Sequence, residues 1–136
     1  MADKRHARGI VDTSVVVDLN LIAAARLPVE LAVSAVTMAE LAAGPHATAD
    51  PAERARRQDR LQRAEATFEP LPVDAAVARA YGRVYAAVAA AGRKARGGRA
   101  FDLLIAATAV AAGLPLYTRN PDDFADLLDL LHIVKV

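Results

Sequence analysis

Short apolar runs alternate with helical segments along the whole chain, and this alternation constrains the fold more than any other feature. Apolar runs predict buried strands at 9–12, 29–35, 114–118 and 131–136. The run at 68–73 contains two prolines and predicts only a short edge strand or a loop. Helical spacing covers 14–25, 37–43, 51–67, 74–91, 101–112 and 120–128. Such alternation predicts an α/β fold with three layers, α/β/α, around a central, mostly parallel sheet.

The chain has the length of one domain, and we expect a single domain over 1–136 with a short polar tail at 1–8. Pro51 and Asp74 are typical helix-start residues, and Gly92 and Gly113 typical stops. The tail lacks the apolar core of a signal peptide, and no apolar run reaches the roughly 20 residues of a membrane span. We therefore expect a cytoplasmic protein without a membrane partner.

The composition excludes several kinds of site. Cysteine is absent and only three histidines occur, far apart in the sequence, so thiolate chemistry and a histidine-based zinc site are disfavoured. Aromatic residues make up 4% of the chain, too few for a typical base-stacking platform. Oxygen is the remaining ligand type for a metal ion.

Four acidic residues lie at or near strand–helix junctions: Asp12, Glu40, Asp102 and Asp123. In an open parallel sheet the functional site forms at the carboxyl ends of the strands. Four carboxylates that converge there would repel one another unless a cation lay between them. Carboxylate oxygens without nitrogen or sulfur ligands suit Mg²⁺, with Mn²⁺ as a substitute, and such ions support hydrolysis of phosphodiesters.

Helix capping is an alternative explanation for each acid taken alone. Asp12 is placed to cap the helix that follows it, and Asp102 to face the positive end of its helix dipole. Thr37 with Glu40, and Asn120 with Asp123, have the spacing of a capping box.

Taken together, four segments resemble the PIN-domain family, and within it the VapC-type toxins of toxin–antitoxin pairs. The segments are IVDTSV at 10–15, SAVTMAEL at 34–41, FDLLIAA at 101–107 and YTRNPDDF at 117–124. The resemblance extends from Gly9 to Val136 and implies a Mg²⁺-dependent endoribonuclease. It also implies a homodimer that a small cognate antitoxin holds inactive.

The resemblance further implies roles for individual residues. Asp12 and Asp102 would be the principal metal ligands, and Glu40 would bind the metal or orient its water. The fourth ligand is open, because many relatives have Asp where Asn120 stands. Asp123 is the preferred candidate, Asp122 is the alternative, and Asn120 could contribute its side-chain oxygen in a supporting role. Hydroxyls at the strand ends would line the site: Thr13, Ser14 and Thr118.

Charge is distributed unevenly although the formal net charge is +1. Residues 51–100 carry eleven basic and five acidic side chains. Those of 51–67 are expected to form a solvated, salt-bridged helix face. The loop before Asp102 contains no acid, and we expect its cations to contact RNA phosphates: Arg93, Lys94, Arg96 and Arg99. Small apolar residues at 75–82 suit either the core or a partner surface.

Two other classes share some of these features. A phospho-accepting receiver-like signalling domain has the same size and binds Mg²⁺, but would be expected to show an acid pair after the first strand and a lysine after the last. Here Asp12 is followed by Thr13, and Lys135 lies inside the final run. A non-catalytic binding module is the other alternative, and it predicts no stabilisation by Mg²⁺.

Overall fold

A four-stranded parallel sheet forms the centre of the computed structural model, which describes residues 5–93 and 98–136. The strand order is β2-β1-β3-β4, with β1 at Arg8–Val11, β2 at Glu30–Ala32, β3 at Leu116–Thr118 and β4 at Ile133–Lys135. Every pair of neighbours runs parallel, with Ile10 opposite both Ala32 and Leu116. All four strands therefore point their carboxyl ends toward the same edge, as the sequence predicted.

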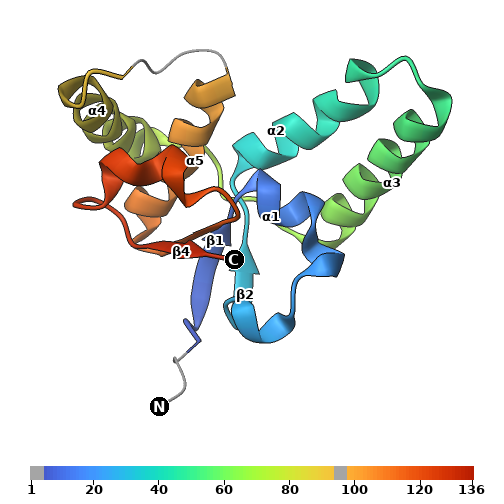
Figure 1. Cartoon of the computed structure of the whole chain (residues 1–136), viewed down its shortest axis with the longest axis horizontal. Coiled ribbons are helices and arrows are strands. Elements are labelled where there is room, and N and C mark those ends of the chain that lie inside the picture. Colours follow the sequence, from blue (N-terminus) through green and yellow to red (C-terminus); the bar gives the residue numbers. More distant parts are fainter. Residues whose placement is uncertain (1–4, 94–97) are drawn as a thin grey trace.

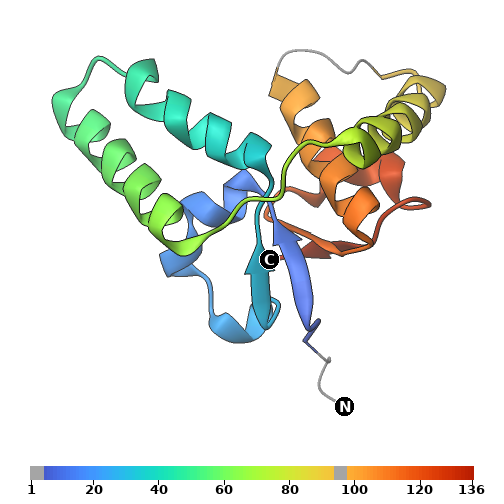
Figure 2. The same cartoon turned by 180° about the vertical axis from the view of Figure 1, so that it is seen from behind.

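Five α-helices cover the two faces of the sheet: α1 (Thr13–Val17), α2 (Ala35–Ala43), α3 (Pro51–Thr67), α4 (Ala75–Ala90) and α5 (Gly98–Ala112). Helices α2 and α3 form one arm of the molecule, and α4 and α5 form the other (Figures 1 and 2). Short 3₁₀ segments complete the chain: η1 (Leu19–Leu21), η2 (Ala24–Arg26), η3 (Gly44–Ala47) and η4 (Pro121–Leu127). The predicted three-layer α/β/α fold is confirmed.

Two hydrophobic clusters lie on opposite faces of the sheet because successive strand residues point in opposite directions. Ile10 and Leu116 face the cluster beneath α4, α5 and η4, whereas Val11 and Tyr117 face the cluster beneath α1, α2 and α3. The ring of Tyr117 lies over β1 at Gly9, where an added Cβ would be 2.7 Å from a ring carbon. Only glycine fits this close approach without displacement of the ring.

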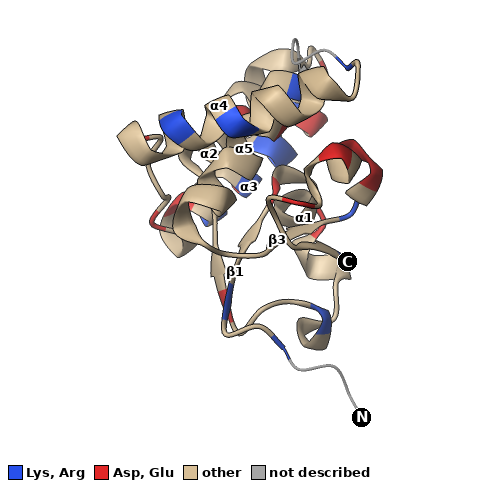
Figure 3. Ribbon diagram, turned by 90° about the vertical axis from the view of Figure 1, so that its left-hand side faces the viewer, with Lys and Arg blue, Asp and Glu red and all other residues tan. Residues whose placement is uncertain are grey.

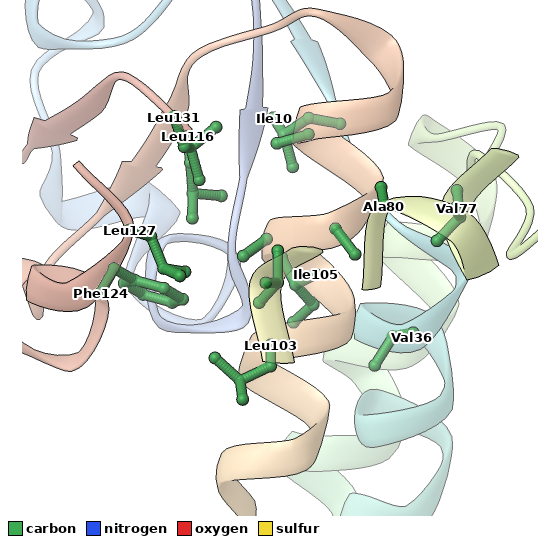
Figure 4. Packing of buried hydrophobic residues seen from close by; sticks show 14 of the residues in the cluster. Ile10, Val36, Val77, Ala80, Leu103, Ile105, Leu116, Phe124, Leu127 and Leu131 are labelled. Atoms are coloured by element: carbon green, nitrogen blue, oxygen red, sulfur yellow. The ribbon is translucent and has the colours of Figure 1, made fainter. Parts of the chain in front are cut away.

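The core also positions two of the candidate acids. Leu103 and Ile105, which follow Asp102 within one turn of α5, are fully buried, and so is Phe124, the neighbour of Asp123. Figure 4 shows these side chains packed together in the cluster on the α5 side. Burial of the neighbouring side chains therefore fixes the backbone that carries Asp102 and Asp123.

Several predicted elements have different bounds in the structure. The helix expected at 14–25 ends at Val17 and continues as η1 and η2, consistent with the low helix propensity of its three successive valines. Helix α2 begins two residues earlier than expected, and α5 begins at Gly98 rather than Phe101. The helix expected from Asn120 is the 3₁₀ segment η4.

Other local expectations are confirmed. Helix α3 has the predicted bounds, and Asp74 caps α4 by accepting a hydrogen bond from the backbone N–H of Val77. Gly92 and Gly113 follow α4 and α5 with φ of +76° and +67°, the left-handed conformation that favours glycine at helix ends. The segment at 68–73 contributes only an isolated bridge between Leu71 and Ser34.

The polar tail that we expected at 1–8 is shorter, because Arg8 already belongs to β1. Within this tail the Arg5 guanidinium donates hydrogen bonds to the carbonyls of Leu27 and Pro28. None of the described helices has the length and apolar character to cross a bilayer.

Candidate active site

Asp12 follows β1 directly and is 5% exposed. Its Oδ1 accepts hydrogen bonds from the Ser14 hydroxyl at 2.5 Å and from the backbone N–H of Val15 at 3.2 Å. Asp12 is therefore the N-cap of α1, as the capping alternative predicted. One carboxylate oxygen makes both of these bonds, so capping leaves the other oxygen available for a ligand.

Glu40 is held by a threonine that comes from the first junction. The Thr13 hydroxyl donates to Glu40 Oε1 at 2.7 Å and lies 3.1 Å from the hydroxyl of the buried Thr37. Ser34, not Thr37, is the N-cap of α2, so the predicted Thr37–Glu40 capping box is wrong. The reason is that α2 begins earlier, which places Glu40 near the middle of the helix and turns its side chain toward α1.

Asp102 lies one turn inside α5, because the helix begins at Gly98. Burial raises the pKa of the Asp102 carboxyl from 3.8 to about 6. Repulsion by the carboxylates of Glu40, Asp123 and Asp12, in that order, contributes to the rise, whereas the Arg99 guanidinium opposes it. Asp102 lies a full turn after the first residue of α5, beyond the first turn in which the helix dipole acts most strongly.

Asp123 lies on η4, where its side chain is exposed. It is one of the three acids that raise the pKa of Asp102, whereas the exposed Asp122 is not. The backbone N–H of Asp123 donates to the carbonyl of Asn120, and the Asn120 side chain caps nothing, so the predicted Asn120–Asp123 capping box is also wrong. These contacts favour Asp123 over Asp122 as the fourth acid.

Two further hydroxyls organise the end of β3. Ser14 Oγ accepts from the backbone N–H of Arg119 at 3.1 Å while it donates to Asp12, so it links the first and last junctions. The fully buried Thr118 accepts from the backbone N–H of Asn120 at 3.0 Å. The Arg119 side chain pairs with Asp18 at 3.3 Å, and Asp18 is not among the acids that raise the pKa of Asp102.

The four acids carry the donor set of a hard divalent cation: oxygen only, with no cysteine in the chain. In the part of the chain that the structure describes, no three Asp, Glu or His side chains are close enough to hold a metal ion as they stand. The raised pKa of Asp102 nevertheless places the other three within electrostatic reach. A set of mutually repelling carboxylates with oxygen ligands alone fits a divalent cation, which would relieve that repulsion.

The basic residues before Asp102 have an unexpected partner. Arg93 and Arg99 lie 3.4 Å and 3.6 Å from the same carboxylate oxygen of Asp126 on η4. The predicted RNA contacts Lys94 and Arg96 lie outside the described residues. The two described arginines are therefore anchored beside the acids by a carboxylate, a contact that the absence of acids in the loop sequence did not suggest.

Comparison with known proteins assigns this arrangement to a family. The model of the PIN domain matches residues 10–129. The chain belongs to the PIN-domain family. The ribonuclease VapC5 of Mycobacterium tuberculosis (strain ATCC 25618 / H37Rv) is 39% identical over 124 residues, which cover 89% of this chain and 88% of that protein. This similarity places the chain among the VapC ribonuclease toxins and decides against the receiver-like and binding-module alternatives.

Solved structures support the PIN fold independently. VapBC-5 of M. tuberculosis, a member of the VapBC family of toxin–antitoxin systems, has a TM-score of 0.80 and 38% identity, covering 96% of this chain and 99% of that chain. FitAcB of Neisseria gonorrhoeae has a TM-score of 0.70 at 23% identity, covering 93% and 96%. PIN-domain nucleases typically depend on a metal ion, in agreement with the oxygen-only donor set.

One buried pair of the PIN domain was not found from the sequence. The hydroxyls of Ser34, at the start of α2, and Thr108, on α5, lie 3.2 Å apart in the core, and Thr108 also donates to the carbonyl of Leu104. The pair joins the helix that carries Glu40 to the helix that carries Asp102. Thr108 is the lone polar residue in an apolar stretch, which is the signal that could have identified it.

We expect Thr108→Val to lower the free energy of unfolding by about 1–2 kcal/mol, because Ser34 loses a buried hydrogen-bond partner. Urea unfolding measures the change. Thr67→Val is the matched control: its hydroxyl is bonded to the carbonyl of Arg63 on an exposed part of α3, and the expected loss is below about 0.5 kcal/mol. Equal losses in the two variants would contradict a structural role for the buried pair.

Proposed function

We propose that this VapC-family chain is a Mg²⁺-dependent endoribonuclease in which Asp12, Glu40, Asp102 and Asp123 hold the cation. The observation that carries the proposal is the 39% identity to a VapC ribonuclease over 89% of the chain, and the mutual influence of the four carboxylates supports their grouping. Carboxylates that oppose one another's ionisation are costly for the fold, and a divalent cation offsets that cost. Mn²⁺ has the same ligand preference and is expected to substitute.

The chain's own residues would orient the acidic ligands, supply an ionised carboxylate and attract the RNA backbone. A bound divalent cation supplies charge neutralisation at the phosphodiester and a water of lowered pKa. Thr13 orients Glu40, and Ser14 orients Asp12, through the bonds of 2.7 Å and 2.5 Å. Asp102 remains ionised near neutral pH when a cation lies beside it. Arg93 and Arg99 would attract the RNA backbone, with Lys94 and Arg96 extending this basic segment.

Expression in a bacterial host tests the activity directly. Induction of the intact chain is expected to arrest growth and to cleave cellular RNA, whereas Asp102→Asn is expected to do neither. Equal effects from both chains would contradict the proposal.

A small cognate antitoxin is the second part of the proposal, and a groove of about 360 Å³ between α1–η1 and α3 is suited to receive it. Val16, Val17 and Leu19 line one wall, and Arg56, Arg60 and Arg63 line the other. Leu21 at the end of η1 is 78% exposed. A segment with apolar and acidic side chains would complement both walls.

We expect Arg60→Glu to weaken binding of the cognate antitoxin by about tenfold or more, about 1.4 kcal/mol. Arg60 forms no ion pair among the described residues, whereas Arg56 and Arg63 pair with Glu53 and Asp59. Titration calorimetry measures the affinity. Arg79→Glu, an exposed charge reversal on α4, is the control and is expected to bind as the unchanged chain does. Equal weakening by both substitutions would place the antitoxin elsewhere.

Homodimerisation stays a prediction. Helix α4 presents Tyr85, 51% exposed, beside Tyr81, with ring centroids 6.2 Å apart. A second copy of the chain that covered these rings would bury apolar surface that α4 leaves in water.

A further inference from the structure

A second pocket, which none of the four acids lines, lies beside β3 and β4 and is formed by residues that precede β1 and β4 and by residues of β3 and β4 themselves. We call it the basal pocket. Its volume is about 470 Å³, and its charged and aromatic lining consists of Arg5, Arg26, Lys135, His6, His132 and Tyr117. His6 precedes Asp12 by six residues, so at ~3.3 Å per residue the two lie about 20 Å apart along β1. The basal pocket is therefore separate from the candidate active site.

The charge of the basal pocket is of one sign. Its lining includes two arginines and a lysine but no Asp or Glu. None of these three cations takes part in an ion pair among the described residues; the nearby Arg8 pairs with Glu30 instead. Figure 3 shows basic ribbon at this end of the molecule, near the N-terminus, apart from the acidic ribbon around α1. Uncompensated cations around a hollow attract an anionic ligand.

The walls of the basal pocket are held in place. The Arg5 guanidinium donates to the carbonyls of Leu27 at 3.1 Å and Pro28 at 3.2 Å. The Tyr117 ring, packed over Gly9, meets the ring of His6 edge-on with centroids 6.1 Å apart. The His6 and His132 rings are 5.2 Å apart.

The cations of the basal pocket suit the phosphate of a nucleotide, and its aromatic rings suit the base. Guanidinium and ammonium groups bind phosphate oxygens. The exposed imidazole rings of His6 and His132 provide faces and edges for a base, and the buried ring of Tyr117 supports His6 from behind. The volume lies in the range of about 300–1,000 Å³ that is typical of small-molecule sites.

We propose that the basal pocket binds a phosphate-bearing nucleotide through Arg26, Lys135 and the His6–His132 ring pair, away from the acids. The nucleotide is either free or part of an RNA strand, since both present the same phosphate and base. In the second case the pocket would hold RNA without touching the reacting phosphate. It would then influence the KM for RNA and leave kcat unchanged.

Binding measured in EDTA tests this proposal independently of cleavage. The probes are adenosine monophosphate, inorganic phosphate and a fluorescent single-stranded RNA of about ten nucleotides, a length that exceeds the ~20 Å between the two sites. The test variant is Arg26→Glu/Lys135→Glu. The matched control is Arg79→Glu/Arg83→Glu, which makes the same charge change on exposed positions of α4. Thermal unfolding confirms that each variant is folded.

We expect the test variant to bind the nucleotide about tenfold more weakly or worse, and the control to stay within about threefold. A loss of affinity for adenosine monophosphate alone identifies a free nucleotide as the ligand. A loss of affinity for RNA identifies a nucleotide within a strand. His132→Ala, which keeps all three cations, is expected to weaken the binding of the nucleotide but not the binding of inorganic phosphate. Equal losses in test and control variants, or phosphate binding as tight as nucleotide binding, would overturn the proposal.

Discussion

Asp102→Asn is expected to reduce the kcat for RNA cleavage by about 10²–10³-fold or more, the usual cost of removing one group that stabilises developing charge. Asn keeps the size of the side chain but loses the negative charge that a divalent cation requires. Leu103, which follows Asp102 in α5, is fully buried, so the backbone of α5 is expected to stay in place. The loss of activity would then report chemistry and not unfolding.

Single-turnover cleavage of a labelled RNA at saturating Mg²⁺ measures this effect. Asp129→Asn is the control, because Asp129 is exposed and forms no ion pair among the described residues. We expect the control to cleave at the rate of the unchanged chain. An Asp102→Asn chain that kept more than about a tenth of the activity would show that this carboxylate is not a principal ligand.

Divalent cations are expected to stabilise the intact chain strongly. At a Mg²⁺ or Mn²⁺ concentration of 100 times Kd, binding to the folded state alone contributes about 2.7 kcal/mol and raises Tm by several degrees. Asp102→Asn removes one ligand and is expected to lose most of this gain. Differential scanning calorimetry with and without the cation measures it.

In EDTA the same substitution is expected to have the opposite effect. The pKa of Asp102 is about 6 in the folded chain and 3.8 in the reference state, so between these values the folded chain holds a proton that the unfolded chain has lost. Stability therefore falls as pH rises from about 4 to above 6. With allowance for the partial exposure of Asp102, the fall is about 1–2 kcal/mol.

Asp102→Asn removes this fall, so in EDTA at pH 8 it is expected to be more stable than the intact chain, whereas Asp129→Asn is not. With Mg²⁺ the order of the intact chain and Asp102→Asn is reversed. A variant that is less stable than the intact chain under both conditions would contradict repulsion among the four carboxylates.

Periodicity was sufficient to predict the layers of this fold, because local signals specify them. Helix α3 follows from Pro51 and an uninterrupted polar helical stretch, and the parallel sheet follows from apolar runs separated by helices. The acids Asp12, Glu40, Asp102 and Asp123 were proposed from their places at or near helix starts and strand ends. Parallel strands bring such positions to one edge, which is the physical basis of the proposal, and the role of these acids stays a prediction.

The details that failed depend on contacts between distant segments. Ser34 caps α2 in place of Thr37, and its hydroxyl also meets Thr108 from α5, a contact that local capping patterns do not include. Asp126 reaches Arg93 and Arg99 only because η4 packs beside the start of α5. Counting charges along the chain therefore overestimated how free the two arginines are.

Crystals soaked in Mn²⁺ provide the most direct test of the four-carboxylate site, because anomalous scattering locates the ion without reference to activity. The account predicts an anomalous peak between Asp12 and Asp102, with Glu40 and Asp123 turned toward it. Mn²⁺ bound elsewhere, or no peak at these carboxylates at a Mn²⁺ concentration that supports cleavage, would contradict it.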